Sequence, residues 1–274
     1  MVVSRRTSLS LRAVALVYLT LLLLLPVGVV FWRTFEHGAG TAWAFMTTPA
    51  AVSALWLSLL IAAVAVPLNT IFGVGAALVL TRGKAPRAGK AVLDTLIDLP
   101  FVVSPVIIGL ALILVYGQGG WFGDTFLNNG IRIIYAVPGM VIATVFVSLP
   151  FVVREVAPVL AQVGDEQEQA AATLGASSWQ AFWRVTLPSV RWGVAYGVVL
   201  TTARALGEIG AVLVVSSNVA GSTLTLPLLI FQRDEQVGGL ATTSVYAAAT
   251  ELALLSIAVL LLMTMFGSRT RGAR

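Results

Sequence analysis

Long apolar runs alternate with short polar segments along this sequence. A helix needs about 20 apolar residues to cross the hydrocarbon core of a bilayer, and six runs reach or approach that length. The fourth run is short, and we expect its helix to extend past Arg154. The pattern predicts an all-α polytopic membrane protein with six transmembrane helices between residues 11 and 266, flanked by tails at 1–10 and 267–274. The six runs are Leu11–Trp32, Val52–Leu80, Leu93–Tyr116, Val137–Val153, Trp192–Val215 and Leu240–Phe266.

The first run follows Arg5, Arg6 and Arg12 and has the general look of a secretory signal peptide. Its apolar core is longer than that of a signal peptide, and no clear small-x-small cleavage site follows it. We therefore interpret this run as a retained membrane anchor.

Proline and glycine interrupt several of the runs. Pro67, Pro100 and Pro105 lie inside apolar stretches, and Gly73 and Gly75 follow the first of them. Proline removes a helical hydrogen bond and kinks the helix. Such breaks persist in membranes where neighbouring helices or a cavity satisfy the freed backbone groups. A transport pathway and irregular packing explain these interruptions equally well.

The composition agrees with a membrane protein. The chain is 58% hydrophobic and 11% charged, with a mean hydropathy of +0.94. A soluble domain has about 25% charged residues. The sequence contains no cysteine, which excludes a disulfide framework and a thiolate metal site. His37 is the only histidine, so a histidine-based zinc or haem site is implausible, and we expect His37 at the surface.

The basic residues lie mostly in alternate segments between the runs. Thirteen of the 17 lie before the first run, between the second and third, around the segment after the fourth, or after the last. Only Arg33, Arg132 and Arg233 fall in the opposite segments. Because basic residues favour cytoplasmic loops, both termini and residues 155–191 are predicted to be cytoplasmic. Membrane topology therefore explains the pI near 10.1, and no nucleic-acid partner is expected.

The polar segment Asp165–Pro188 stands between two apolar runs and predicts two short helices. Asp165 and Glu168 have the spacing of a capping box, as do Ser177 and Gln180. Gly175 is placed to end the first helix in a left-handed conformation. The pair Leu187-Pro188 is expected to end the second helix, because a residue before proline is disfavoured in the α region.

Two charged residues, Arg204 and Glu208, lie inside the fifth apolar run. Their four-residue spacing allows them to pair on one helix face. An intramembrane charge is costly and marks a functional site by default. We weigh two interpretations, a gate or anion-pathway element and a buried ion pair that fixes helix packing. The second is slightly favoured, because Glu208 would repel a dianion if it faced the pore.

The sequence offers little support for an enzyme. It has no Gly-x4-Gly-Lys-[Ser/Thr] phosphate loop. The glycines of Gly117–Gly123 only approximate a dinucleotide fingerprint, and we interpret them as an external turn. Asp94 and Asp98 could be paired acids, but we expect them to be first-turn residues that suit the positive end of a helix.

The polar segment resembles the cytoplasmic loop of permease subunits in ATP-binding-cassette importers. That family's pattern is Glu-Ala-Ala, three residues, Gly, nine residues and Ile-x-Leu-Pro. The resemblance implies a type I importer permease fold and a coupling loop, residues 155–191, that docks into a groove of a separate ATPase subunit. Gln169 stands where the family has Glu, with Glu168 one residue earlier, and Val185 replaces Ile. The matching or neighbouring residues are Glu168, Gln169, Ala170, Ala171, Gly175, Val185, Leu187 and Pro188.

The flanking blocks are similar to the W-type permeases of sulfate and thiosulfate importers. These blocks are Gly120–Asp124, Ser148–Val156, Gly175–Val212 and Ser222–Leu228. The resemblance implies an inner-membrane location, a T-type permease partner, a homodimeric ATPase that binds the ATP, an external sulfate-binding protein and no cofactor in this chain. The alternatives are a molybdate or tungstate permease, or an ion-coupled secondary transporter that uses Glu208.

Overall fold

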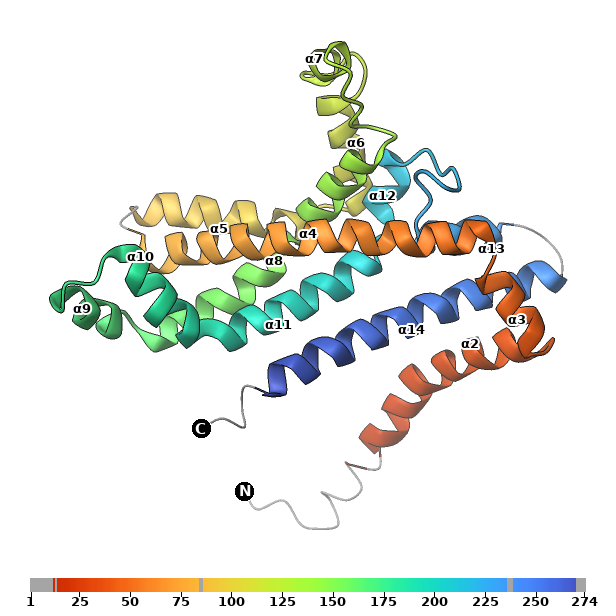
Figure 1. Cartoon of the computed structure of the whole chain (residues 1–274), viewed down its shortest axis with the longest axis horizontal. Coiled ribbons are helices and arrows are strands. Elements are labelled where there is room, and N and C mark those ends of the chain that lie inside the picture. The colour runs from red at the N-terminus through yellow and green to blue at the C-terminus, as the bar shows by residue number, and fades with distance from the viewer. Residues whose placement is uncertain (1–11, 13, 84–85, 236–238, 270–274) are drawn as a thin grey trace.

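The computed structural model describes residues 12, 14–83, 86–235 and 239–269, and all regular elements in these ranges are helices (Figure 1). The long elements are α4 (Pro49–Arg82), α5 (Arg87–Val102), α8 (Val137–Val163), α11 (Leu187–Leu206) and α14 (Gly239–Arg269). The shorter α-helices are α2 (Leu25–Phe35), α3 (Ala39–Met46), α6 (Pro105–Tyr116), α7 (Gly123–Asn128), α9 (Glu166–Thr173), α10 (Ser178–Ala181), α12 (Gly210–Val215) and α13 (Leu226–Asp234). Two π-helical turns, η1 (Thr20–Leu24) and η2 (Phe182–Thr186), precede α2 and α11. The expected all-α class is confirmed.

Helices α4, α8 and α11 form the centre of the molecule, and small residues let them approach closely. A Cβ atom on Gly73 of α4 would lie 2.6 Å from Cβ of Val152 in α8. A Cβ on Gly197 of α11 would lie 2.9 Å from Cα of the same valine. Close contacts between helix backbones are the usual use of glycine in membrane helices. Gly73 is therefore a packing residue, whereas Gly75 faces open space.

Two buried apolar clusters hold these helices together. The first gathers side chains of α4, α6, α8, α12 and α13 around Met140 and Leu226. The second lies nearer α9 and α10 and gathers α4, α5, α8 and α11 around Val152 and Val156. Buried polar contacts fix the register between distant segments. Asn69 donates to Ser148 at 2.8 Å, and the backbone N–H of Leu226 donates to Ser58 at 2.9 Å.

The number of spans differs from the expected six. Among the described residues, four helical stretches are long and apolar enough to cross a membrane by themselves. A fifth is added if α5 and α6, which meet at an angle of 111°, are one broken span. The fifth apolar run is also interrupted, since α11 ends at Leu206 and α12 begins at Gly210. The four single spans are Val14–Phe35, Pro49–Arg82, Val137–Val163 and Thr242–Met263.

Helix α6 leaves the layer of long helices at this bend and carries α7 at its tip (Figure 1). Helix α12 packs against α6, and a Cβ on Gly109 would lie 2.7 Å from Cβ of Val214. Helices α2 and α14 lie side by side, tied by a 2.7 Å hydrogen bond between Thr34 and Thr250. Helices α9 and α10 lie at one end of the long axis and α3 and α13 at the other (Figure 1).

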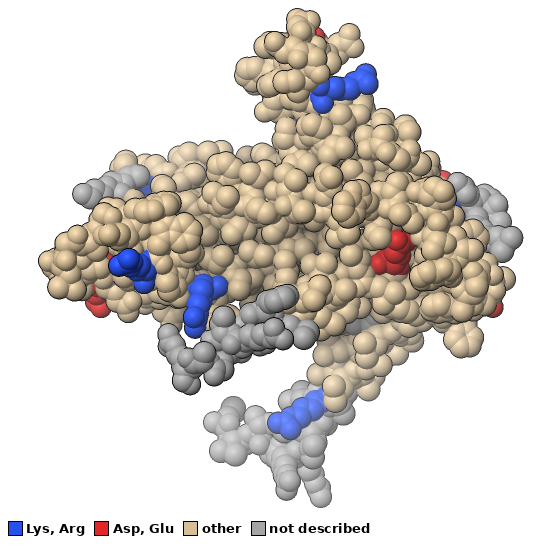
Figure 2. All heavy atoms as spheres, viewed as in Figure 1, with Lys and Arg blue, Asp and Glu red and all other residues tan. Residues whose placement is uncertain are grey.

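The surface of the long helices is apolar. Large hydrophobic side chains such as Trp56 and Ile71 of α4 are each 69% exposed. The face in Figure 2 is covered almost entirely by uncharged residues. An apolar surface of this extent fits burial in lipid or against another membrane subunit.

Candidate functional site

The polar segment folds as two short helices joined by a left-handed glycine, as expected. Gly175 has a φ of +86°, a region that costs about 1–2 kcal/mol for a residue with Cβ. Its N–H donates to the carbonyl of Ala172, and the N–H of Ala176 donates to that of Ala171, both at 3.0 Å. These two bonds form a Schellman motif, which satisfies the last carbonyls of α9.

The capping predictions have different outcomes. Ser177 and Gln180 form the expected capping box at the start of α10, with bonds of 3.3 and 3.0 Å. The box predicted for Asp165 and Glu168 is wrong, because Asp165 makes no side-chain capping bond. Glu168 turns toward the long helices instead.

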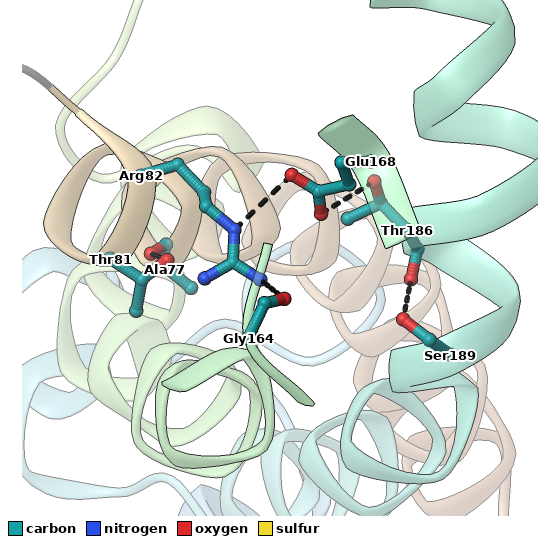
Figure 3. A network of polar contacts seen from close by, with 7 residues as sticks. All are labelled: Ala77, Thr81, Arg82, Gly164, Glu168, Thr186 and Ser189. Carbon is teal, nitrogen blue, oxygen red and sulfur yellow. Dashed lines mark hydrogen bonds and ion pairs between the residues drawn. The ribbon is translucent and has the colours of Figure 1, made fainter. Parts of the chain in front are cut away.

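Glu168 connects three elements of the structure (Figure 3). One carboxylate oxygen accepts from Nε of Arg82, in the last turn of α4, at 3.2 Å. The other accepts from the hydroxyl of Thr186, at the start of α11, at 2.9 Å. Arg82 also donates to the carbonyl of Gly164, which precedes α9. We name Arg82, Gly164, Glu168 and Thr186 the Glu168 cluster.

The cluster is well shielded from water. The side chains of Arg82 and Glu168 are only 20% and 25% exposed, and Thr186 is buried. Thr186 in turn accepts, through its carbonyl, the hydroxyl of Ser189 at 2.7 Å (Figure 3). Because α4, α9 and α11 meet at one carboxylate, a displacement of α9 reaches two of the long helices directly.

The other residues of the resemblance lie in two groups. Gln169 and Ala170 are exposed on α9, and Leu174 beside Gly175 is 89% exposed. Trp179 and Trp183 are exposed, and their rings pack edge to face with 5.5 Å between the ring centroids. The set Ala171, Val185 and Leu187 is half-buried. The segment thus exposes large apolar and aromatic side chains among polar ones.

The expected helix end at Leu187-Pro188 is wrong. The helical path continues from α10 through the π turn η2 into α11, and Pro188 lies in the first turn of α11. Proline is tolerated there because it follows the π turn, where the backbone hydrogen-bond pattern is already irregular. Helix α8 likewise extends past Arg154 to Val163, as expected. The segment between the long helices is therefore 164–186, narrower than 155–191.

The interpretation of Asp94 and Asp98 as first-turn acids is also wrong. Both lie well inside α5, which begins at Arg87 and has no acid in its first turn. Arg154 of α8 lies 3.0 Å from Asp94 and donates through Nε to Asp98 at 2.8 Å. The two acids fasten α5 to α8, and Arg154 is an interhelical residue rather than a loop residue.

Arg204 and Glu208 form the expected ion pair, with 2.8 Å between Nη2 and Oε2. They do not share one helix, because α11 ends at Leu206 and Glu208 lies in the break before α12. Oε1 of Glu208 accepts from the N–H of Ala211 at 2.9 Å, in the first turn of α12. The Glu208 side chain is 1% exposed, whereas that of Arg204 is 32% exposed.

Sequence reasoning missed several residues. The sequence indicates Arg82 only as one of the basic residues between the second and third runs, and no pattern singles out Thr186, because only the fold brings them to Glu168. Glu251 of α14 has a buried oxygen, Oε2, without a hydrogen-bond partner in the described part of the chain. A carboxylate inside the sixth apolar run was a visible signal for this residue. His37 is exposed, as expected, and contacts Thr243 at 2.9 Å.

Comparison with known families shows to which family the chain belongs. The family model described as "Binding-protein-dependent transport system inner membrane component" matches residues 69–272. The chain belongs to this family. Its members are membrane transport subunits, so this chain is a transport subunit and not an enzyme.

The similar proteins have related names. The chain is 49% identical, over 94% of its length and 92% of the relative, to the "Sulfate transport system permease protein CysW" of Synechocystis sp.. It is 43% identical to the protein of that name in Escherichia coli, over 89% and 82% of the two chains. It is 36% identical to the "Sulfate transport system permease protein CysT" of Synechocystis sp., over 93% and 89%.

The fold is similar to that of a chain in a solved importer. The crystal structure of a bacterial ABC transporter involved in the import of the acidic polysaccharide alginate matches with a TM-score of 0.79. The match covers 97% of this chain and 96% of that chain at 15% identity. The expected ABC importer permease fold is therefore confirmed.

Proposed function

We propose that this chain is the W-type permease subunit of an ATP-driven importer for sulfate or thiosulfate. The observation that carries the proposal is the similarity at 43–49% identity to proteins named CysW, over most of the chain. The chain is also similar to CysT proteins, at lower identity. Because the similarity to CysW is higher, the W type is favoured over the T type.

The coupling element in this proposal is the segment 164–186. Its exposed face, with Leu174, Trp179 and Trp183, has the apolar and aromatic character of a docking surface. The Schellman turn at Gly175 holds α9 and α10 at a fixed angle. Gln169 is exposed and uncharged, so the docking does not depend on a charge at that position.

The remaining partners follow from this assignment. The chain pairs with a T-type permease around the translocation path and receives the anion from an external binding protein. A homodimer of a cytoplasmic ATPase binds the ATP, and this chain holds no cofactor and contacts no nucleic acid. The chain lies in the inner membrane, and both termini and the segment 164–186 are cytoplasmic.

Two other functions remain as alternatives. Molybdate and tungstate permeases share the polar-segment pattern and the Arg-x-x-Gly-Glu motif, which here is Arg204–Glu208. An ion-coupled secondary transporter would use Glu208 as a proton or sodium relay. The burial of Glu208 behind Arg204 disfavours the relay, because a relay carboxylate needs access to water.

Uptake of labelled sulfate tests the proposal. The chain is co-expressed with its neighbouring transport genes, and uptake into membrane vesicles is measured with thiosulfate or molybdate as competitor. We expect sulfate uptake that requires ATP, persists with an ionophore, and is competed by thiosulfate more strongly than by molybdate. Uptake abolished by the ionophore while ATP is maintained would establish the secondary transporter. Stronger competition by molybdate would establish the molybdate permease.

A further inference from the structure

The bend between α5 and α6 opens a cleft beside Arg204. The cleft has a volume of about 400 Å³ and is lined by residues 100–105, by Val147 and Phe151 of α8, and by Arg204. The stretch 103–104 is the non-helical break where the third apolar run turns by 111°. The cleft therefore lies where two interrupted apolar runs, the third and the fifth, come together.

The cleft contains one cation and one hydroxyl among apolar side chains. Arg204 is the only charged residue of its lining, and Ser104 is the only lining residue with a side-chain hydroxyl. The other lining residues are proline, valine and phenylalanine. A charge interacts more strongly in apolar surroundings than in water, because the effective dielectric constant is lower there. The apolar side chains around Arg204 therefore make its attraction for an anion stronger than in bulk water, and polar atoms form the rest of the lining.

The guanidinium of Arg204 has hydrogen-bond donors that Glu208 does not occupy. It carries five N–H donors in a planar fork, and only Nη2 lies within ion-pair distance of a carboxylate in the described residues. That contact is not aligned as a hydrogen bond, since Oε2 of Glu208 has no hydrogen-bond partner. With 32% of its side chain exposed, Arg204 can offer the remaining N–H groups to the cleft.

Glu208 does not compete for this space. Its side chain is 1% exposed, and it is absent from the lining of the cleft. Glu208 therefore does not contact an anion held in the cleft, and its charge acts on that anion only from a greater distance than the charge of Arg204. Because Glu208 lies 2.8 Å from Arg204, its negative charge reduces the positive potential of the guanidinium and weakens its attraction for an anion. A transport site must bind weakly enough to let its ion leave.

Ser104 supplies a second polar group. It precedes α6 and makes no side-chain capping bond, and it is exposed in the same lining as Arg204. A hydroxyl with no internal partner in the described residues can donate to an oxyanion.

We propose that this cleft is a transient site for a tetrahedral oxyanion on the translocation path, with Arg204 as its cation and Ser104 as a further donor. The proposal rests on the proposed function, since it names where the transported anion is held. The ligand chemistry is that of sulfate and its analogues, for which the planar fork of arginine offers two parallel donors. The ion pair buries Glu208 and leaves Arg204 32% exposed, so its cation remains available to the cleft.

The absence of cysteine from the sequence permits a direct test. Ser104→Cys introduces the only thiol of this chain, which is labelled in the assembled complex with thiosulfonate reagents of either sign. The sulfonate-bearing reagent places an oxyanion next to Arg204, and the ammonium-bearing reagent places a cation there. We expect Arg204→Gln to slow labelling by the anionic reagent about threefold or more relative to labelling by the cationic reagent. The reason is that the substitution removes one positive charge from a cleft that is only partly filled with water. Arg191→Gln is the matched control, an exposed arginine of α11 outside the cleft lining, and should leave the ratio unchanged.

Protection gives a second measurement that needs no change at Arg204. Sulfate should slow labelling of Ser104→Cys by both reagents, and an equal concentration of chloride should not. Labelling unaffected by sulfate in a complex that imports sulfate would overturn the proposal, as would a reagent ratio that Arg204→Gln leaves unchanged. A wild-type complex that does not import sulfate would instead contradict the proposed function. In that case the dependence of the reagent ratio on Arg204 still decides whether the cleft attracts anions.

Discussion

Arg82 and Glu168 are 86 positions apart in the sequence and form an ion pair of 3.2 Å between α4 and α9. The same carboxylate accepts the hydroxyl of Thr186 at the start of α11. Where the family pattern has Glu, this chain has Gln169, and the glutamate one position earlier faces the long helices. The acidic residue of the segment thus has an internal structural role here, while the outer face is uncharged at Gln169.

The first prediction concerns the Glu168 cluster. Glu168→Gln should reduce sulfate uptake per ATP hydrolysed, because α9 is held less firmly against α4 and α11. A hydrogen bond to a charged group contributes about 1.5–3 kcal/mol, so the loss is sizeable but leaves the fold intact. The measurement is uptake and ATP hydrolysis by the same reconstituted complex. Glu166→Gln, an exposed acid of the same helix, should have little effect. If both variants import the same amount of sulfate per ATP hydrolysed, the Glu168 cluster does not couple ATP hydrolysis to transport.

The second prediction concerns Gly175. Gly175→Asp places a side chain on a backbone with a φ of +86° and should change the angle between α9 and α10. The chain should remain in the membrane, since the segment lies outside the long helices, but ATP-driven uptake should be lost. Co-purification of the ATPase with the variant measures docking directly.

The control for Gly175→Asp is a carboxylate at a helical position of the same segment. Gln167→Asp fits, because Gln167 is exposed on α9 and an acid suits the first turn of a helix. Gly164 is unsuitable as a control, since its φ of +71° is also left-handed. Retention of both uptake and ATPase by Gly175→Asp would rule out the segment as the coupling element.

The third prediction concerns the partner of Arg204. Arg204→Ala leaves the Glu208 carboxylate buried without a counter-charge, which costs about 3–5 kcal/mol where such pairs have been broken in soluble proteins. We expect less assembled complex after mild heating in detergent. Adding Glu208→Gln should restore the amount of complex, because the amide oxygen still accepts from the N–H of Ala211. Uptake should not return with it, since the anion site lacks its cation. Restored uptake in the double variant would leave Arg204 a purely structural role.

The fourth prediction concerns membrane topology. Gln118, in the turn between α6 and α7, should face outward, and Gln167 should face the cytoplasm. In this cysteine-free chain, Gln118→Cys should react with an impermeant thiol reagent in intact cells, and Gln167→Cys only after permeabilisation. A tag after Arg274 should likewise be inaccessible from outside. Labelling of Gln167→Cys in intact cells would show that the segment 164–186 faces outward. That topology would contradict the docking proposal.

Local signals in the sequence were sufficient for most of the helices and for two of their ends. The left-handed Gly175 and the capping box of Ser177 and Gln180 depend on residues a few positions apart, so they could be predicted. The apolar runs indicated the membrane helices for the same reason. Two local predictions failed where a distant residue competed. Glu168 binds Arg82 rather than its own helix start, and Asp98 binds Arg154.

The sequence by itself determined that this is an all-α membrane protein with a polar two-helix segment and an intramembrane pair, Arg204 and Glu208. Periodicity, hydropathy and short-range spacing carry that information. Only the tertiary structure decided that the third run bends by 111° and that the fifth run is interrupted. It also decided that Arg204 faces a cleft while Glu208 is buried. The four-residue spacing cannot predict which of the two side chains, Arg204 or Glu208, is exposed, because exposure depends on which helices pack over each side chain.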